Sequence, residues 1–120
     1  MAKILVVDDS PSEMAKFRDI LSRHHHEVIE AHTGEEGIQK ANEQLPDVIL
    51  MDVVMPEMNG FQATRKITRD PKTSHIPVVI ISTKNQETDR VWGKRQGAKD
   101  YLTKPVTEDA LIHLIRTIME

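Results

Sequence analysis

The chain has 120 residues, the size of one domain that can bury a core of its own. It contains no cysteine, which excludes disulfides and thiolate metal sites and suits a reducing cytoplasm, where we expect the protein to act. The formal net charge of −3 gives no general reason to bind nucleic acid, and no apolar run approaches the roughly 20 residues of a membrane-spanning helix.

The first part of the chain predicts two strand–helix units. Residues 4–7 are branched and aliphatic, which is typical of a strand buried on both faces. The helix that follows begins after Ser10 as N-cap, with Glu13 at the capping-box position. A second strand is predicted over residues 27–31, and a second helix begins after Thr33.

The rest of the chain repeats this alternation, with apolar strand-like runs separated by segments of helical periodicity. In order, the sequence predicts a strand over 47–51, a helix over 61–69, a strand over 77–81, a helix over 86–96, a strand over 100–103 and a final helix after Thr107. Strands that alternate with helices predict an α/β fold in which helices cover both faces of a five-stranded parallel sheet. No linker or repeat interrupts the pattern, so we expect residues 1–120 to form one domain with no output domain.

Charged and hydroxyl side chains follow several of the predicted strands. Asp8 and Asp9 come after the first strand and Asp52 after the third, where it ends an apolar run. Ser82 follows the fourth strand and Lys104 the fifth. Because ligands of open α/β sheets bind beyond the carboxyl ends of the strands, we expect these groups to lie together. Their net charge of about −2 suits a hard divalent cation bound through oxygen, and Mg²⁺ fits best.

Each of these residues also has a plain structural interpretation. An Asp pair after a strand often caps a helix, although Ser10 already fills that position here. Lys104 alone would be a solvated loop lysine, and Ser82 alone would bond a backbone group. Their joint placement at the ends of one sheet favours a functional site.

Four motifs give the chain a recognisable resemblance from end to end. They are VVDDS (6–10), LMDVVMPEMNG (50–60), IIST (80–83) and YLTKP (101–105). In this order and spacing they resemble the response-regulator receiver domains, of which the chemotaxis protein CheY is the single-domain example. The stretches DDSPSEM, NGFQATR and ETDRVWGKRQGAKDYLTKPV are similar to the PilH-type regulators of twitching motility. The resemblance implies a doubly wound, flavodoxin-like sheet of strand order 2-1-3-4-5.

The resemblance also implies a chemistry for the acidic residues. Asp52 would be the phosphoacceptor, taking a phosphoryl group from the phosphohistidine of a CheA-like sensor histidine kinase. Mg²⁺ would be bound by Asp9, Asp52 and the backbone carbonyl of Val54, with Asp8 acting mostly through water. Such a protein modifies itself and is not a conventional enzyme.

A conformational switch is implied by the same resemblance. Lys104 and Ser82 would each contact a phosphoryl oxygen, and the Lys104–Pro105 peptide bond would be cis. On phosphorylation Ser82 would move toward the phosphoryl group and Tyr101 would turn from exposed to buried. Ser82 stands where Thr is commoner in the family, and the missing methyl group weakens the expected coupling to Tyr101.

Two further positions are expected to tune the lifetime of the phosphorylated form. They are Val54 and Lys84, and Val54 has no polar group with which to position a water. We therefore hypothesise that Val54→Asn changes the dephosphorylation rate.

A partner-binding face is expected on the helix at 86–96, the strand at 100–103 and the final helix. Trp92 is the only tryptophan of the chain and is a candidate anchor there. Lys94, Arg95 and Lys99 add positive charge to this region, which could steer a downstream acidic protein. The alternatives are a packing role for Trp92 and an ordinary solvated helix face.

The sequence therefore predicts a stand-alone response regulator that signals by protein contact. One alternative is a phosphate sink for a shared kinase, and another is an interaction module that is never phosphorylated. An aspartate-nucleophile phosphatase is disfavoured because Asp8 and Asp9 are adjacent instead of forming Asp-x-Asp, and the chain leaves no room for a cap domain.

Overall fold

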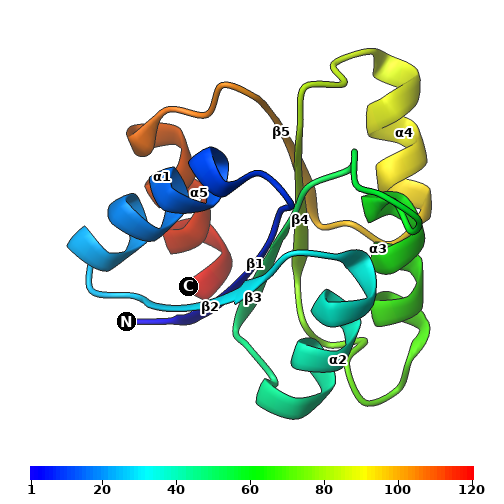
Figure 1. The fold of residues 1–120 in the computed structure, drawn as a ribbon, viewed down its shortest axis with the longest axis horizontal. Helices are drawn as coiled ribbons and strands as arrows, with labels where there is room; N and C mark the ends of the chain where they lie inside the picture. The colour runs from blue at the N-terminus through cyan, green and yellow to red at the C-terminus, as the bar shows by residue number, and fades with distance from the viewer.

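The computed structural model describes residues 1–120 as five strands and five helices in strict alternation (Figure 1). The strands are β1 (Lys3–Val7), β2 (Glu27–Ala31), β3 (Val48–Met51), β4 (Val78–Ser82) and β5 (Asp100–Thr103). The helices are α1 (Pro11–Arg23), α2 (Gly34–Gln44), α3 (Gly60–Arg69), α4 (Glu87–Arg95) and α5 (Glu108–Met119). The strands predicted from the sequence are all present, with ends that agree to within one residue. None of the helices combines the length and the apolar character that crossing a membrane requires.

The five strands form one parallel sheet in the order β2-β1-β3-β4-β5, so the predicted fold class and strand order are confirmed. Val7, the last residue of β1, pairs with Met51, the last residue of β3. Ser82 at the end of β4 likewise pairs with Thr103 at the end of β5. This register brings the residues that follow four different strands to a single edge of the sheet.

Helices cover both faces of the sheet. Figure 1 shows α1 and α5 on one face and α2, α3 and α4 on the other. The core of the first face packs Phe17 of α1 and Leu111 of α5 against Ile4, which is fully buried. The core of the second face packs Ile67 of α3 against Leu5. Neighbouring residues of β1 therefore point into opposite cores, as the period of two in a strand requires.

Side chains at the N-caps define where the helices begin. The hydroxyl groups of Ser10, Thr33 and Thr107 accept hydrogen bonds from backbone N–H groups in the first turns of α1, α2 and α5, as the sequence predicts. Helix α3 begins with a capping box that the sequence analysis did not assign. There the Asn59 side chain accepts from the Gln62 N–H, and the Gln62 side chain accepts from the Asn59 N–H, each at 2.9 Å. This cap fixes where the loop after β3 ends.

Candidate functional site

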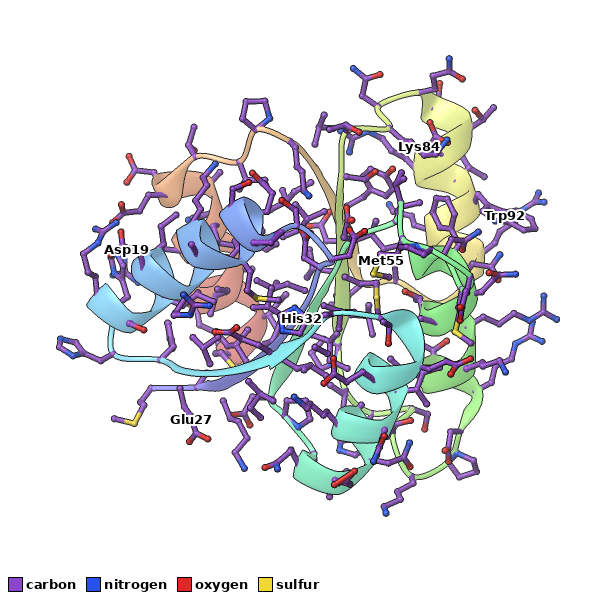
Figure 2. The ribbon with its side chains drawn as sticks, in the orientation of Figure 1. Asp19, Glu27, His32, Met55, Lys84 and Trp92 are labelled. Carbon is purple, nitrogen blue, oxygen red and sulfur yellow. The ribbon has the colours of Figure 1, made fainter.

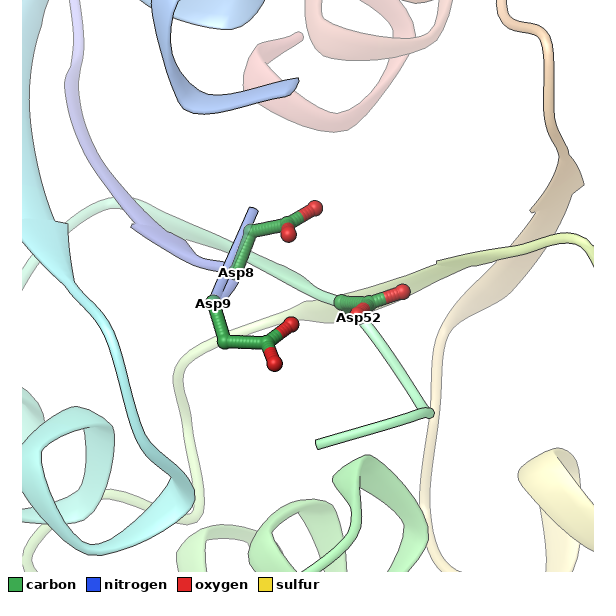
Figure 3. Close-up of side chains that lie close together, drawn as sticks. All are labelled: Asp8, Asp9 and Asp52. Atoms are coloured by element: carbon green, nitrogen blue, oxygen red, sulfur yellow. The ribbon is translucent and has the colours of Figure 1, made fainter. Parts of the chain in front are cut away.

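Three carboxylates meet at the carboxyl ends of β1 and β3. The backbone N–H of Asp52 donates to the Val7 carbonyl at 2.9 Å, which extends the pairing of β1 with β3 by one residue. One carboxylate oxygen from each of Asp8, Asp9 and Asp52 lies within 4.8 Å of the others, and Figure 3 shows the three side chains together. Asp8 and Asp52 are only 2% and 8% exposed, whereas Asp9 is open to solvent. The structure thus brings together the acidic residues that the sequence places on separate strands.

The backbone of Asp52 is held by the start of α3. The Gly60 N–H donates to the carbonyl of Val53 at 2.9 Å, which closes the loop between β3 and α3. A Cβ atom added at Gly60 would lie 1.9 Å from the carbonyl oxygen of Asp52, far inside any van der Waals contact. Glycine is therefore required here by the close approach of two backbones, and that approach fixes the position of Asp52.

Lys104, which directly follows β5, lies beside these carboxylates. Its ammonium donates to Asp8 Oδ2 at 3.0 Å and to Asp52 Oδ1 at 3.2 Å. Its own backbone N–H donates to the Ser82 carbonyl at 2.8 Å, and the Lys104–Pro105 peptide bond is cis. The side chain of Lys104 is 12% exposed, so its charge acts where screening by water is weak.

Glu13 also faces Lys104, at 3.6 Å between Oε1 and Nζ. The sequence predicts that its side chain bonds back to the Ser10 N–H as half of a capping box, and this prediction is wrong. Asp8 Oδ1 accepts from that N–H instead, at 2.9 Å, which leaves the Glu13 carboxylate free to turn toward Lys104. The capping motif could not reveal this competition, because Asp8 reaches Ser10 only in the geometry of the turn after β1.

The charges of the site shift the pKa of Asp52. Burial, and then the nearby charge of Asp8, raise the pKa of Asp52 from 3.8 to about 6, although Lys104 acts in the opposite sense. Burial lowers the pKa of Lys104, but its bond to Asp8 and the charges of Asp52 and Asp8 outweigh this and leave it raised. At neutral pH Asp52 is therefore mainly a carboxylate and Lys104 is an ammonium.

The donor set fits a hard divalent cation. Asp8 and Asp52 repel each other strongly enough to help raise the pKa of Asp52, and a cation placed among the carboxylates would relieve this repulsion. Carboxylate oxygens are the ligands that Mg²⁺ prefers, usually together with waters and phosphate oxygens. Lys104 alone does not balance the negative charge of Asp8, Asp9 and Asp52. The site can therefore accept both a cation and an anionic group.

Comparison with known proteins decides the family. Residues 4–116 match the response regulator receiver domain family. The chain belongs to the response-regulator receiver family. The receiver is 57% identical to Protein PilH of Pseudomonas aeruginosa over 99% of this chain and 98% of that protein. It is 41% identical to the response regulator PleD of Caulobacter vibrioides over 98% of this chain, which spans 26% of PleD.

Solved structures agree with this assignment. The chemotaxis response regulator CheY4 of Vibrio cholerae superimposes with a TM-score of 0.92, at 31% sequence identity and over 98% of each chain. A response regulator from Chloroflexus aurantiacus superimposes with a TM-score of 0.93, at 27% identity, over 98% of this chain and 97% of that one. The receiver therefore shares both the sequence motifs and the backbone of CheY-like proteins.

Ser82 and Tyr101 are linked through the loop after β4. Ser82 is fully buried, and its hydroxyl oxygen accepts from the Lys84 N–H at 3.1 Å. Tyr101 is 3% exposed, and its hydroxyl donates to the Lys84 carbonyl at 2.7 Å. Burial raises the pKa of Tyr101. Both residues of the expected switch therefore bond the backbone of Lys84, and Tyr101 is buried, while the switch itself stays a prediction.

Arg90 of α4 secures Tyr101 from the solvent side. Its guanidinium lies 5.2 Å from the centre of the Tyr101 ring, a cation–π contact. It also donates to the Tyr101 carbonyl at 3.2 Å and to the Thr103 hydroxyl at 2.8 Å. The sequence analysis did not single out Arg90. No signal in the sequence marks Arg90, because its contact with Tyr101 depends on how α4 packs against β5.

Trp92 and Val54 line the same hollow. A cavity of about 380 Å³ between the β3–α3 loop and α4 is lined in part by Val54, Lys84 and Trp92. Val54 is 60% exposed and Trp92 is 48% exposed. Figure 2 shows Trp92 on α4 and Lys84 on the loop that precedes this helix. Trp92 is therefore close to the two positions expected to tune the lifetime of the phosphorylated form.

The four residues proposed from the sequence as one partner face lie on α4 or directly before β5. Arg95 and Lys99 line a separate groove of about 870 Å³, which also includes Asp47 and Met119. Lys94 is exposed on α4 and lines neither hollow. These hollows do not test the proposed partner face of α4, β5 and α5, which stays a prediction.

Proposed function

We propose that this receiver is a stand-alone response regulator whose Asp52 accepts a phosphoryl group from the phosphohistidine of a sensor kinase. The observation that supports this most directly is the surroundings of Asp52. Its carboxylate ends a buried strand, lies beside Asp8 and Asp9, and is bonded to the ammonium of Lys104 at 3.2 Å. Phosphoryl transfer requires alignment and neutralisation of charge on oxygen, and this arrangement provides both.

In the forward reaction a carboxylate oxygen of Asp52 attacks the phosphorus atom of the donor. A new P–O bond forms while the bond from phosphorus to the kinase histidine nitrogen breaks, and the nitrogen keeps the electron pair. Mg²⁺ would neutralise developing charge on the phosphoryl oxygens, held by Asp9, Asp52 and the backbone carbonyl of Val54, with Asp8 acting through water. The chain itself contributes the fixed direction of Asp52, set by Gly60, and the positive charge of Lys104.

The phosphorylated form is then lost by hydrolysis. A water oxygen attacks phosphorus, the P–O bond to Asp52 breaks, and Asp52 recovers its carboxylate with the electron pair. The water loses a proton, and inorganic phosphate leaves. Val54, two residues after Asp52, and Lys84 line one hollow, and they would set how readily a water is positioned at Asp52. The protein thus catalyses only its own phosphorylation and dephosphorylation.

The signal would pass through Ser82. A phosphoryl oxygen near Lys104 offers the Ser82 hydroxyl a new charged acceptor, whereas Ser82 now accepts from the Lys84 N–H. Because Tyr101 bonds the carbonyl of the same residue, a shift of Lys84 bears directly on Tyr101. The altered surface would then be the one formed by α4, β5 and α5, where a downstream protein would bind.

We propose a chemotaxis-like pathway that controls type IV pilus twitching motility as the biological setting. Support comes from the 57% identity to Protein PilH over nearly the whole of both chains. The kinase in such a pathway would be CheA-like. A regulator of this kind delivers its output by contact with another protein.

One experiment tests the proposal against its rivals. The receiver and its Asp52→Ala variant are incubated with Mg²⁺ and acetyl phosphate, and intact mass is followed with time. A transient gain of one phosphoryl group that Asp52→Ala abolishes supports the proposal. Rapid multiple-turnover release of phosphate from unrelated phosphate esters would favour a phosphatase. Absence of any modification would favour an interaction module that is never phosphorylated.

A further inference from the structure

We propose that Glu13 is a positioning residue that competes with the phosphoryl group for the ammonium of Lys104. This inference rests on the proposed phosphorylation of Asp52 and adds a residue to that site. Glu13 would hold part of the charge of Lys104 away from Asp52, so that the receiver is phosphorylated more slowly than its other residues allow.

The geometry places three carboxylates around a single ammonium. Lys104 Nζ lies 3.0 Å from Asp8, 3.2 Å from Asp52 and 3.6 Å from Glu13. The contacts to Asp8 and Asp52 are hydrogen bonds, whereas Glu13 interacts through its charge alone. The side chain of Glu13 is 31% exposed, so it stands at the mouth of the site. No other cation lies within 4.0 Å of its carboxylate.

Glu36 shows that a glutamate three residues after an N-cap does not have to point away from its own helix start, as Glu13 does. Glu36 holds the equivalent place in α2, three residues after the N-cap Thr33. Its carboxylate accepts from the His32 N–H at 2.6 Å and pairs with Lys40 at 3.3 Å, so it serves the start of its own helix. Glu13 makes no hydrogen bond of this kind, and the Ser10 N–H that a capping box would offer it is bonded to Asp8. The Glu13 side chain points instead toward Lys104, which is bonded to Asp52.

The consequence follows from charge. By formal charge, the four carboxylates of Asp8, Asp9, Asp52 and Glu13 and the ammonium of Lys104 sum to −3, or to −1 with Mg²⁺ bound. The arriving phosphoryl donor is an anion, and its oxygens require the ammonium that Glu13 also attracts. Removing the charge of Glu13 reduces the repulsion and frees Lys104, while the hydrogen bond to Asp8 keeps the ammonium in place.

The test compares Glu13→Gln with the unaltered receiver at saturating Mg²⁺ and with acetyl phosphate as donor. In this step an Asp52 oxygen bonds to phosphorus, and the P–O bond to acetate breaks with acetate keeping the electron pair. We expect the second-order rate of phosphorylation to rise about two- to fivefold, the size of an exposed ion-pair effect. The ratio should shrink at high ionic strength, because salt screens charges at the mouth of the site.

Two further variants separate this effect from a general change of charge or fold. Glu36→Gln removes the same charge from a helix start that does not face Lys104, and its rate should match that of the unaltered receiver. Glu13→Asp keeps the charge on a shorter side chain, and its rate should lie between those of the unaltered receiver and Glu13→Gln. A salt-insensitive increase, or an equal increase in Glu36→Gln, would contradict the proposal.

A binding measurement gives a readout that does not depend on turnover. Beryllium trifluoride is an anionic mimic of the phosphoryl group, and Trp92 is a fluorescent reporter in the hollow beside Val54. We expect Glu13→Gln to bind it about two- to fivefold more tightly. If the unaltered receiver takes up no phosphoryl group, the proposed function fails. The alternative result is that the unaltered receiver is phosphorylated, while Glu13→Gln shows the same phosphorylation rate and the same affinity for beryllium trifluoride. That result would overturn only the role of Glu13.

Discussion

Gly60 lies so close to Asp52 that a Cβ atom at position 60 would be 1.9 Å from the Asp52 carbonyl oxygen. The first residue of α3 is therefore packed against the backbone of the proposed phosphoacceptor. The capping box of Asn59 and Gln62 fixes the start of the helix, so neither partner of this contact can move alone.

Gly60→Ala should lower the free energy of unfolding and disturb the site at the same time. Either α3 or the end of β3 must shift to admit the methyl group, at a cost of about 1–3 kcal/mol. Chemical denaturation measures the first effect, and the rate of phosphorylation by acetyl phosphate measures the second. Gly34→Ala is the matched control, because its Cβ would lie 3.2 Å from Met58 and far from Asp52. Equal effects of the two substitutions would contradict this account.

Asp52→Asn should make the protein more stable at neutral pH. The pKa of Asp52 is raised from 3.8 to about 6 in the fold, so ionising this side chain in the folded state costs free energy that builds up as the pH rises from about 4 to about 6. Below about pH 4 the carboxyl group is protonated in both the folded and unfolded states, and the cost disappears. The advantage of Asp52→Asn should therefore grow as pH rises through this window, to about 1–3 kcal/mol at pH 7.

Denaturation of both proteins across this pH range, with a chelator present, measures the difference. Asn is a suitable replacement because its side-chain oxygen can still accept from Lys104. A stability difference that stays constant between pH 4 and pH 7 would show that the ionisation of Asp52 is not its source. Added Mg²⁺ should reduce the advantage, because binding to the carboxylates stabilises the unaltered protein.

Tyr101→Phe should destabilise the fold by about 1 kcal/mol, the usual net value of one hydrogen bond. It removes the donor to the Lys84 carbonyl but keeps the buried ring and its contact with Arg90. Hydrogen exchange should show faster opening of residues 83–86 and little change in β5. Arg90→Ala is the complementary variant, because it removes the contacts of the guanidinium and leaves the hydroxyl bond. If hydrogen exchange of residues 83–86 is unchanged in Tyr101→Phe, the Tyr101 hydroxyl does not stabilise this segment.

Val54→Asn should shorten the lifetime of the phosphorylated form severalfold. Val54 is 60% exposed at the border of the site and offers no polar group, whereas an amide could orient the attacking water. The measurement is loss of the phosphoryl mass after the donor is removed. Val54→Thr tests whether a hydroxyl of similar volume has the same effect. An unchanged dephosphorylation rate in Val54→Asn would rule out a role for this position.

Most of the architecture could be predicted from local signals. Apolar runs gave the strands, N-cap residues such as Ser10 and Thr107 gave the helix starts, and alternation gave a parallel sheet. The acidic site followed from the rule that ligands bind at the carboxyl ends of strands. These signals are short in range or general to the fold class, which is why they can be read without coordinates.

Contacts that depend on competition in space could not be predicted. Glu13 turns to Lys104 only because Asp8 occupies the N–H group that Glu13 would otherwise bond. Arg90 reaches Tyr101 across the packing of α4 on β5, and no spacing in the sequence encodes that distance.

The pairing of Val7 with Met51 separates the residues fixed by the sheet from those on the surrounding loops. Backbone hydrogen bonds between two central strands set the spacing of the reactive acids, so substitutions at the surface leave that spacing unchanged. Val54, Lys84 and Glu13 stand on loops or a helix turn around this fixed centre. Under the proposed function, Glu13 would adjust the rate of phosphorylation, and Val54 and Lys84 the lifetime of the product, while the sheet keeps the carboxylates at their spacing.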